Sequence, residues 1–190
     1  NDAGSIAISG TATQGQTLST TITDPDGVPA SGITYQWKAD GTNISGATSS
    51  TYTLTNAEVG KAITVVANYT DSRSTAETVT SLATGAVTNT NDAGSIAITG
   101  TATQGQTLST TITDPDGVPA SGITYQWKAD GTNISGATSS TYTLTNAEVG
   151  KAITVVASYT DSRSTAETVT SSATSAVTNT NDAGSIAISG

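Results

Sequence analysis

The sequence contains no cysteine, methionine, phenylalanine or histidine. Without cysteine no disulfide can staple a small fold, and a core must rely on Ile, Val, Leu, Ala and a few Trp and Tyr rings. Without histidine and cysteine the usual ligands of a zinc site are also missing. No Ser/His/Asp or Cys/His set and no phosphate-binding loop can be assembled, so we expect no enzymatic activity.

Basic residues are scarce as well. Six Lys and Arg stand against fifteen Asp and Glu, which gives a net charge of −9 over 190 residues. This charge repels phosphate backbones and attracts cations, so we expect no nucleic-acid partner. No apolar run reaches about 18 residues, and residues 1–20 lack a basic start followed by an apolar stretch. We therefore expect neither membrane insertion nor a signal peptide in this stretch, with any export signal lying elsewhere.

What the sequence does contain is a long repeat. Residues 1–90 return as residues 91–180 with four changes, and residues 181–190 begin a third copy. Two identical active sites in series rarely benefit an enzyme, so duplication favours a role in length or valency. We predict domains at 1–90 and 91–180, with 181–190 as the first strand of a truncated third repeat. The changes are Ser9 to Thr99, Asn68 to Ser158, Leu82 to Ser172 and Gly85 to Ser175.

Within one repeat, apolar residues alternate with Thr, Ser and Gln, and Gly, Pro, Asn and Asp interrupt this pattern every 8 to 12 residues or so. The pattern predicts an all-β fold of tandem immunoglobulin-like sandwiches with about seven strands each, arranged end to end. Trp37 on the third strand should be the central core ring. The expected strands are 4–9, 16–23, 33–39, 43–45, 51–55, 62–70 and 75–80, followed by an extended stretch through Val87.

Two short connections have clear signals. Asp40-Gly41 predicts a tight hairpin turn, because both residues tolerate positive φ. Residues 56–60 predict a single helical turn that is capped by Asn56 and closed by Gly60. In such a turn Glu58 is more simply explained as a solvated acid than as a ligand.

The acids gather at the ends of the predicted sandwich. The chain start and the loops after strands two and six share one pole, which we call the leading pole. The loops after strands one, three and five share the other, the trailing pole. This rule places Asp2, Asp24, Asp26, Asp71 and Glu77 at the leading pole, and Asp40 and Glu58 at the trailing pole.

End-to-end stacking would bring the trailing pole of one repeat to the leading pole of the next. Carboxylates at ~4 to 6 Å repel one another, and a hard divalent cation with six to eight oxygen ligands turns that repulsion into a binding site. Calcium fits this chemistry better than zinc. The candidate ligands of the joint are Asp40, Glu58, Asn89, Asn91, Asp92, Asp114, Asp116, Asp161 and Glu167, and Asp182 would begin the next joint.

Several of these residues have simpler explanations. Residues 24–27, Asp-Pro-Asp-Gly, form a good type I turn without any metal. They do not begin an EF-hand loop, because Val28 would fall at its third ligand position. Asp40 is also explained as a hairpin residue alone. Arg73 can pair with the acids, but one arginine cannot neutralise five carboxylates. The sequons at Asn43 and Asn68 are expected by chance in a chain rich in Ser and Thr.

Four motifs carry a family resemblance: GTATQGQTL at 10–18, ITYQW at 33–37, GATSSTYTL at 46–54 and VGK at 59–61. Together they resemble the tandem bacterial immunoglobulin-like repeats in the extender region of giant RTX adhesins. The resemblance implies calcium-dependent sandwiches, rigidified by ions at their linkers, that project an adhesive tip from a Gram-negative cell. The linker 89–92 also resembles the Asn-Asp linkers of cadherin-like repeats, which implies a ligand role for Asn91 and Asp92.

The leading hypothesis is therefore an extracellular stalk on a bacterial cell surface, monomeric, whose partners are the neighbouring repeats of the same chain. One alternative is an adhesin domain that grips glycan or ice and gains avidity from repetition. That alternative needs exposed aromatic rings. We expect the available rings to be buried in the core, namely those of Tyr35, Tyr52, Tyr69 and Trp37. A second alternative is a metal-free spacer.

Overall fold

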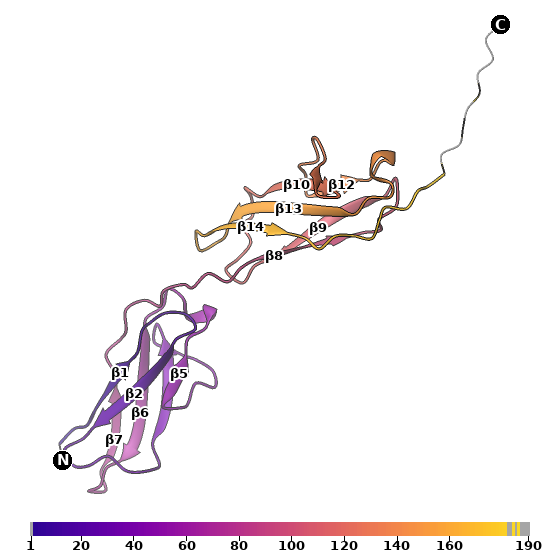
Figure 1. Cartoon of the computed structure of the whole chain (residues 1–190). Coiled ribbons are helices and arrows are strands. Elements are labelled where there is room, and N and C mark those ends of the chain that lie inside the picture. Colours follow the sequence, from indigo (N-terminus) through magenta and orange to yellow (C-terminus); the bar gives the residue numbers. More distant parts are fainter. Residues whose placement is uncertain (1, 182–183, 185, 187–190) are drawn as a thin grey trace. The chain divides into compact units, whose positions relative to one another are not determined.

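A computed structural model describes residues 2–181, 184 and 186 of the chain. The chain divides into two compact units, Asn1–Thr90 and Asn91–Gly190 (Figure 1). The expected strand of a third repeat, with its candidate ligand Asp182, falls largely outside the described residues. In the part of the chain that is described, no helix is long and apolar enough to cross a bilayer.

Each unit is a sandwich of two antiparallel sheets, which confirms the predicted all-β class (Figure 1). In the first unit a three-stranded sheet has the order β1-β2-β5, and a four-stranded sheet has the order β4-β3-β6-β7. The elements are β1 (Ser5–Ser9), β2 (Thr17–Thr23), β3 (Thr34–Ala39), β4 (Thr42–Asn43), β5 (Thr51–Thr53), η1 (Asn56–Glu58), β6 (Ile63–Thr70) and β7 (Ala76–Thr80).

The second unit repeats this arrangement with sheets ordered β12-β9-β8 and β11-β10-β13-β14. Its elements are β8 (Ser95–Thr99), β9 (Thr107–Thr113), β10 (Thr124–Ala129), β11 (Thr132–Asn133), β12 (Thr141–Thr143), η2 (Asn146–Glu148), β13 (Ile153–Thr160) and β14 (Ala166–Thr170). The two units therefore serve as internal controls for each other.

The core lies between the two sheets and is centred on the predicted ring. Trp37 on β3 is fully buried, with Leu18 from the opposite sheet and Val65 from β6. The indole Nε1 of Trp37 donates to the backbone oxygen of Ser49 at 2.8 Å, so its single polar group is satisfied. No Phe or Met is needed, because aliphatic side chains from alternate strand positions fill the remaining space.

The turn chemistry explains where β4 lies. Asp40 and Gly41 both have positive φ, 45° and 79°, so the chain reverses over two residues and Thr42 already pairs with Ala39. The short strand therefore begins and ends earlier than the predicted 43–45. The late extended stretch is present as isolated bridges, in which Ala86 pairs with Ala62 and Thr88 with Thr13.

The predicted helical turn is a 3₁₀ helix, but its cap differs from the expectation. Thr55, not Asn56, is the N-cap, and Thr55 and Glu58 form a capping box. The Glu58 carboxylate accepts the Thr55 backbone N–H at 2.9 Å and its hydroxyl at 2.8 Å. Glu58 is only 5% exposed, so the expectation of a solvated acid was wrong.

Candidate metal centre

The two acids of the trailing pole take part in local structure. Asp40 Oδ1 accepts the backbone N–H of Ala62 at 2.9 Å, which ties the β3–β4 hairpin to the start of β6. Glu58 caps its own helix turn, and burial together with this carboxylate raises the pKa of the Tyr52 hydroxyl. Both carboxylates line the same hollow with Lys61, which places them at one pole as expected. Their role as ligands stays a prediction.

At the leading pole, the loop after β2 presents two aspartates. Asp24 Oδ1 accepts the backbone N–H of Asp26 at 2.8 Å, and the backbone N–H of Gly27 donates to the Asp24 carbonyl at 3.0 Å. The predicted turn is therefore present. It holds the Asp26 side chain, which is 7% exposed, against the end of the sandwich. A turn and a ligand site are thus compatible interpretations of the same four residues.

The loop after β6 supplies a third aspartate with unusual bonding. Asp71 Oδ1 accepts two backbone N–H groups, from Arg73 at 2.8 Å and Thr75 at 2.7 Å. Asp71 Oδ2 is buried and has no hydrogen-bond partner among the described residues. The residue as a whole is 5% exposed. A buried carboxylate oxygen without a partner costs free energy, so a counter-charge at this atom would stabilise the fold.

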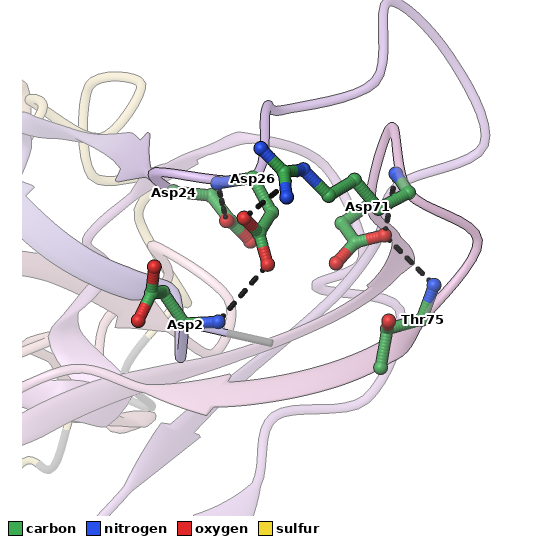
Figure 2. A network of polar contacts seen from close by, with 6 residues as sticks. Asp2, Asp24, Asp26, Asp71 and Thr75 are labelled. Atoms are coloured by element: carbon green, nitrogen blue, oxygen red, sulfur yellow. Dashed lines mark hydrogen bonds and ion pairs between the residues drawn. The ribbon is translucent and has the colours of Figure 1, made fainter.

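These loops bring their carboxylates together with Glu77 of β7. One oxygen each from Asp24, Asp71 and Glu77 lies within 4.8 Å of the other two. Oxygens that bind one calcium ion at about 2.3 to 2.6 Å can be no more than about 5 Å apart, so the spacing suits a shared ion. Figure 2 shows the second oxygen of Asp71 turned away from Thr75 toward the space beside Asp26.

The second unit also gathers three carboxylates at this pole, with Asp116, the counterpart of Asp26, as the third member in place of a counterpart of Glu77. Oxygens of Asp114, Asp116 and Asp161 lie within 4.8 Å of one another. Asp161 Oδ1 accepts the backbone N–H groups of Arg163 and Thr165, each at 2.8 Å, while Oδ2 is buried without a hydrogen-bond partner in the described part of the chain. The same bonding of one aspartate in both copies shows that it is built into the repeat.

The segment that enters each unit is bonded to these acids. The backbone N–H of Asp2 donates to Asp26 Oδ2, and that of Asp92 donates to Asp116 Oδ2, both at 2.9 Å. Figure 2 shows the first of these bonds. Asn91 Nδ2 also donates to Glu167 Oε1 at 2.7 Å. The predicted linker residues and the predicted loop acids therefore meet within the second unit.

The remaining candidate, Asn89, lies half-buried in the last stretch of the first unit, and its ligand role stays a prediction. One arginine also reaches the leading pole. Arg73 Nε lies 3.3 Å from Asp26 Oδ1, but its side chain is 74% exposed. An ion pair with one partner in water is screened and contributes little. This ion pair is made with Asp26, so it supplies no hydrogen-bond partner to the buried Oδ2 of Asp71.

The donor set fits a hard divalent cation. At the 4.8 Å limit of the cluster, two carboxylates repel by about 3 kcal/mol at an effective dielectric constant of about 20. The cluster offers only oxygen atoms, and calcium takes six to eight of them in a flexible geometry, whereas magnesium demands a near-octahedral set. The unpartnered oxygens of Asp71 and Asp161 are the positions that such an ion would satisfy.

A tyrosine that the sequence assigned to the core alone also touches the cluster. The ring of Tyr69 is buried, and its hydroxyl donates to Asp24 Oδ2 at 2.7 Å. Gly4 lies so close that a Cβ there would collide with the Tyr69 hydroxyl. Burial, followed by the hydrogen bond to Asp24 and the charges of Glu77 and Asp71, raises the pKa of Tyr69 above its ordinary value of 10.0.

This pKa predicts alkaline destabilisation. The folded state holds Tyr69 protonated more strongly than the unfolded chain does, so its stabilising effect is complete below pH 10 and is lost as the pH rises above it. Each such tyrosine lowers the free energy of unfolding by up to about 1.4 kcal/mol per pH unit. Calorimetric melting in chelator between pH 8 and 11 measures this slope.

The matched control uses the two copies. Tyr159 has the same surroundings and the same upward pKa shift in the second unit. Tyr69→Phe should flatten the alkaline slope of the first unit's transition and leave that of the second unit unchanged. An equal slope in both units of the variant would show that Tyr69 is not the titrating group.

Sequence reasoning missed three residues at the two ends of the first unit. Tyr69 was assigned to the core only, although a tyrosine near a strand end can direct its hydroxyl to an adjacent loop. Gly4 in the repeated Asn-Asp-Ala-Gly stretch signals a close backbone approach. Gln14, whose side chain accepts the backbone N–H of Thr90 at 3.3 Å, carried no recognisable signal.

Comparison with known proteins gives only distant similarities. No protein family matches the sequence, and no curated protein is significantly similar to it. Three N-terminal domains of the highly immunogenic outer capsid protein of bacteriophage RB49 align at 18% identity and a TM-score of 0.36, covering 89% of this chain and 58% of that one.

Two further solved structures are similar at the same level. A Ca²⁺-stabilised adhesin that helps an Antarctic bacterium reach out and bind ice aligns at 17% identity and a TM-score of 0.37, covering 94% of this chain and 49% of that one. Fibronectin type III-like modules of Clostridium thermocellum align at 16% identity and a TM-score of 0.30, covering 92% and 94%. The chain thus spans less than two thirds of the first two proteins, and likeness at these identities concerns the fold alone.

Proposed function

We propose that this chain is part of the stalk of a bacterial cell-surface adhesin, in which calcium at the leading pole of each unit fixes the linker that enters it. The observation that carries the proposal concerns Asp71 and Asp161: each belongs to a cluster of carboxylates, and the Oδ2 of each is buried without a hydrogen-bond partner among the described residues. A stalk needs repeated, similar units and no active site, which matches two nearly identical copies.

The ligands in the first unit would be Asp24, Asp26, Asp71 and Glu77, and in the second Asp114, Asp116, Asp161 and Glu167. Bound calcium supplies the positive charge that these carboxylates lack. The residues themselves are already held in place: Asp71 and Asp161 by two backbone N–H groups each, and Asp24 and Asp114 by a buried tyrosine hydroxyl. Such preorganisation reduces the cost of ordering side chains on binding.

The linker is connected to this cluster by hydrogen bonds. Asp92 and Asn91 donate to Asp116 and Glu167, which are 3% and 8% exposed. Because of these bonds, calcium binding that fixes the Asp116 and Glu167 carboxylates would also fix the linker. Calcium sites in extracellular modules have dissociation constants on the order of 10⁻⁴ to 10⁻³ M, so millimolar calcium adds roughly 0.5 to 2 kcal/mol per site. The effect is modest at one joint and recurs at every joint of an array.

An adhesin domain that binds glycan or ice through rings is less well supported. Trp37 and Trp127 are fully buried, and Tyr35 and Tyr52 pack against the core. The exposed large hydrophobic side chains of the described residues are Val28, Leu82, Val118 and Ile186, none of them aromatic. In this proposal the partners of the chain are its own neighbouring repeats.

Small-angle X-ray scattering with a matched pair of variants tests the stalk. Asp116→Asn and Asp26→Asn make the same change at equivalent positions of the two units, but only Asp116 bonds the linker between the units. Wild type should show a larger maximum dimension in calcium at about 5 mM than in chelator, because a site of this class is then largely occupied. Asp116→Asn should reduce this response strongly, and Asp26→Asn should leave most of it.

Two results would count against the proposal. A maximum dimension that is the same with calcium and with chelator would remove calcium stiffening and leave a metal-free spacer. An equal loss of the response in both variants would show that the cluster of the second unit has no special connection to the linker.

A further inference from the structure

Thr88 and Thr90, near the end of the first unit, are fastened to it by neutral groups. The backbone N–H of Thr88 donates to the Ala12 carbonyl, and that of Gln14 donates to the Thr88 carbonyl, both at 2.9 Å. The hydroxyls of Thr13 and Thr88 lie 2.8 Å apart in a hydrogen bond. Thr90 then donates its backbone N–H to Gln14 Oε1 at 3.3 Å and its hydroxyl to the Gln14 carbonyl at 3.2 Å. Every acceptor here is a carbonyl, an amide or a hydroxyl oxygen.

The next residue begins a different kind of attachment. Asn91 donates to Glu167 at 2.7 Å, and Asp92 donates to Asp116 at 2.9 Å. Both acceptors are buried carboxylates, and Asp116 belongs to the cluster in which Asp161 has its unpartnered oxygen. The chemistry of the attachment therefore changes from neutral to anionic between two consecutive residues, Thr90 and Asn91.

The two attachments respond differently to a cation. Neighbouring carboxylates repel one another when no positive charge is shared among them, so the positions of Asp116 and Glu167 depend on neutralisation. The Gln14 amide and the backbone carbonyls carry no net charge, so their positions do not. No residue lies between the two attachments to act as a free spacer.

From this contrast we infer that the joint is asymmetric: a divalent cation controls the attachment of Asn91 and Asp92 to the second unit, whereas Thr88 and Thr90 stay fastened to the first unit with or without it. The inference rests on the proposed calcium site, and it states which part of the linker becomes less mobile when calcium binds. The hinge that calcium closes lies on the C-terminal side of the Thr90–Asn91 bond. Gln14 is the positioning residue of the first-unit attachment, which does not depend on calcium, because it accepts both hydrogen bonds from Thr90.

Amide hydrogen exchange followed by NMR on the full chain tests this division. Calcium at about 5 mM, compared with chelator, should slow exchange of the Asp92 N–H by about tenfold and change that of the Thr90 N–H less than about twofold. Gln14→Ala should speed exchange at Thr90 in both conditions and leave the calcium response of Asp92 intact. Gln104→Ala is the matched control, because Gln104 makes the same contacts to Thr180, which does not precede Asn91.

Calcium titration by calorimetry on the same samples tests the calcium site and the asymmetric joint separately. If calcium binds and the Thr90 and Asp92 amides respond together, or neither responds, the asymmetric joint is wrong while the binding site stands. If calcium does not bind, the proposed site and the asymmetric joint both fall. Binding with a response confined to Asp92 supports both.

Discussion

Asp161→Asn is expected to change the stability of the second unit in opposite directions with and without calcium. In chelator the variant should be more stable than wild type, because an amide replaces a buried carboxylate oxygen that has no hydrogen-bond partner among the described residues. The oxygen of the substituted side chain can still accept the backbone N–H groups of Arg163 and Thr165. Relieving one unsatisfied buried charge should raise the free energy of unfolding by about 1 to 2 kcal/mol.

In calcium at about 50 mM, which stabilises a site of this class by roughly 2 to 4 kcal/mol, the order should reverse. Wild type gains the binding free energy of the ion, whereas the variant has lost a central ligand and gains little. For a unit of this size, each kcal/mol moves the melting temperature by about 4 to 8 °C. Differential scanning calorimetry of both proteins, in calcium at about 50 mM and in chelator, shows whether the order of their melting temperatures reverses.

A second aspartate provides the control for this substitution. Asp130 Oδ1 accepts the backbone N–H of Ala152 at the trailing pole, and the backbone of Asp130 has a positive φ of 46°. An asparagine at this position would keep the hydrogen bond through its amide oxygen, and asparagine tolerates positive φ as aspartate does. Asp130→Asn should therefore leave the calcium response of the second unit unchanged. If Asp161→Asn lowered stability equally in both conditions, the buried oxygen would not be a cation ligand.

Gly94→Ala is the second change with a large expected effect. A Cβ at Gly94 would collide with the Tyr159 hydroxyl and lie 2.8 Å from Asp114 Oδ2. The tyrosine ring is buried and cannot swing aside, so the chain entering the unit must shift or the 2.8 Å hydrogen bond from Tyr159 to Asp114 must break. Overpacking of this kind should cost about 1 to 3 kcal/mol and should also weaken calcium binding.

The cause of the Gly94 effect can be checked by a double-mutant cycle. Tyr159→Phe removes the hydroxyl with which the new methyl group collides, so Gly94→Ala should cost less in that background than in wild type. Gly184→Ala is a control in the same local sequence, because no atom of the described residues lies within 4 Å of a Cβ placed there. Costs that simply add in the cycle would show that the collision is not the cause.

The sequence alone was sufficient for the sandwich. Period-two alternation located the strands, the Asp40-Gly41 turn fixed one hairpin, and Trp37 identified the core. The pattern failed at the cap of the helical turn, where Asn56 was chosen although Thr55 and Glu58 match the capping-box spacing. Both Thr and Asn are residue types that often cap a helix, so residue preference alone does not choose between Thr55 and Asn56. The pair of hydrogen bonds between Thr55 and Glu58 decides that Thr55 is the cap.

The candidate site could be predicted as a place but not as a set of bonds. Loop order in a sandwich was enough to put Asp24, Asp26 and Asp71 at one pole. It could not show that one oxygen of Asp71 accepts two backbone N–H groups while the other has no hydrogen-bond partner among the described residues, since that depends on the conformation of a single turn. It also could not show that Gln14 receives the departing chain, because that contact joins residues 76 positions apart.

A crystal structure of the chain grown in calcium, with anomalous difference density collected for the ion, tests the central claim most directly. The account predicts an anomalous peak in each unit about 2.3 to 2.6 Å from Asp71 Oδ2 and from Asp161 Oδ2, with all ligands oxygen. Saturating calcium with no peak at either aspartate, or with ions bound only elsewhere on the surface, would contradict it.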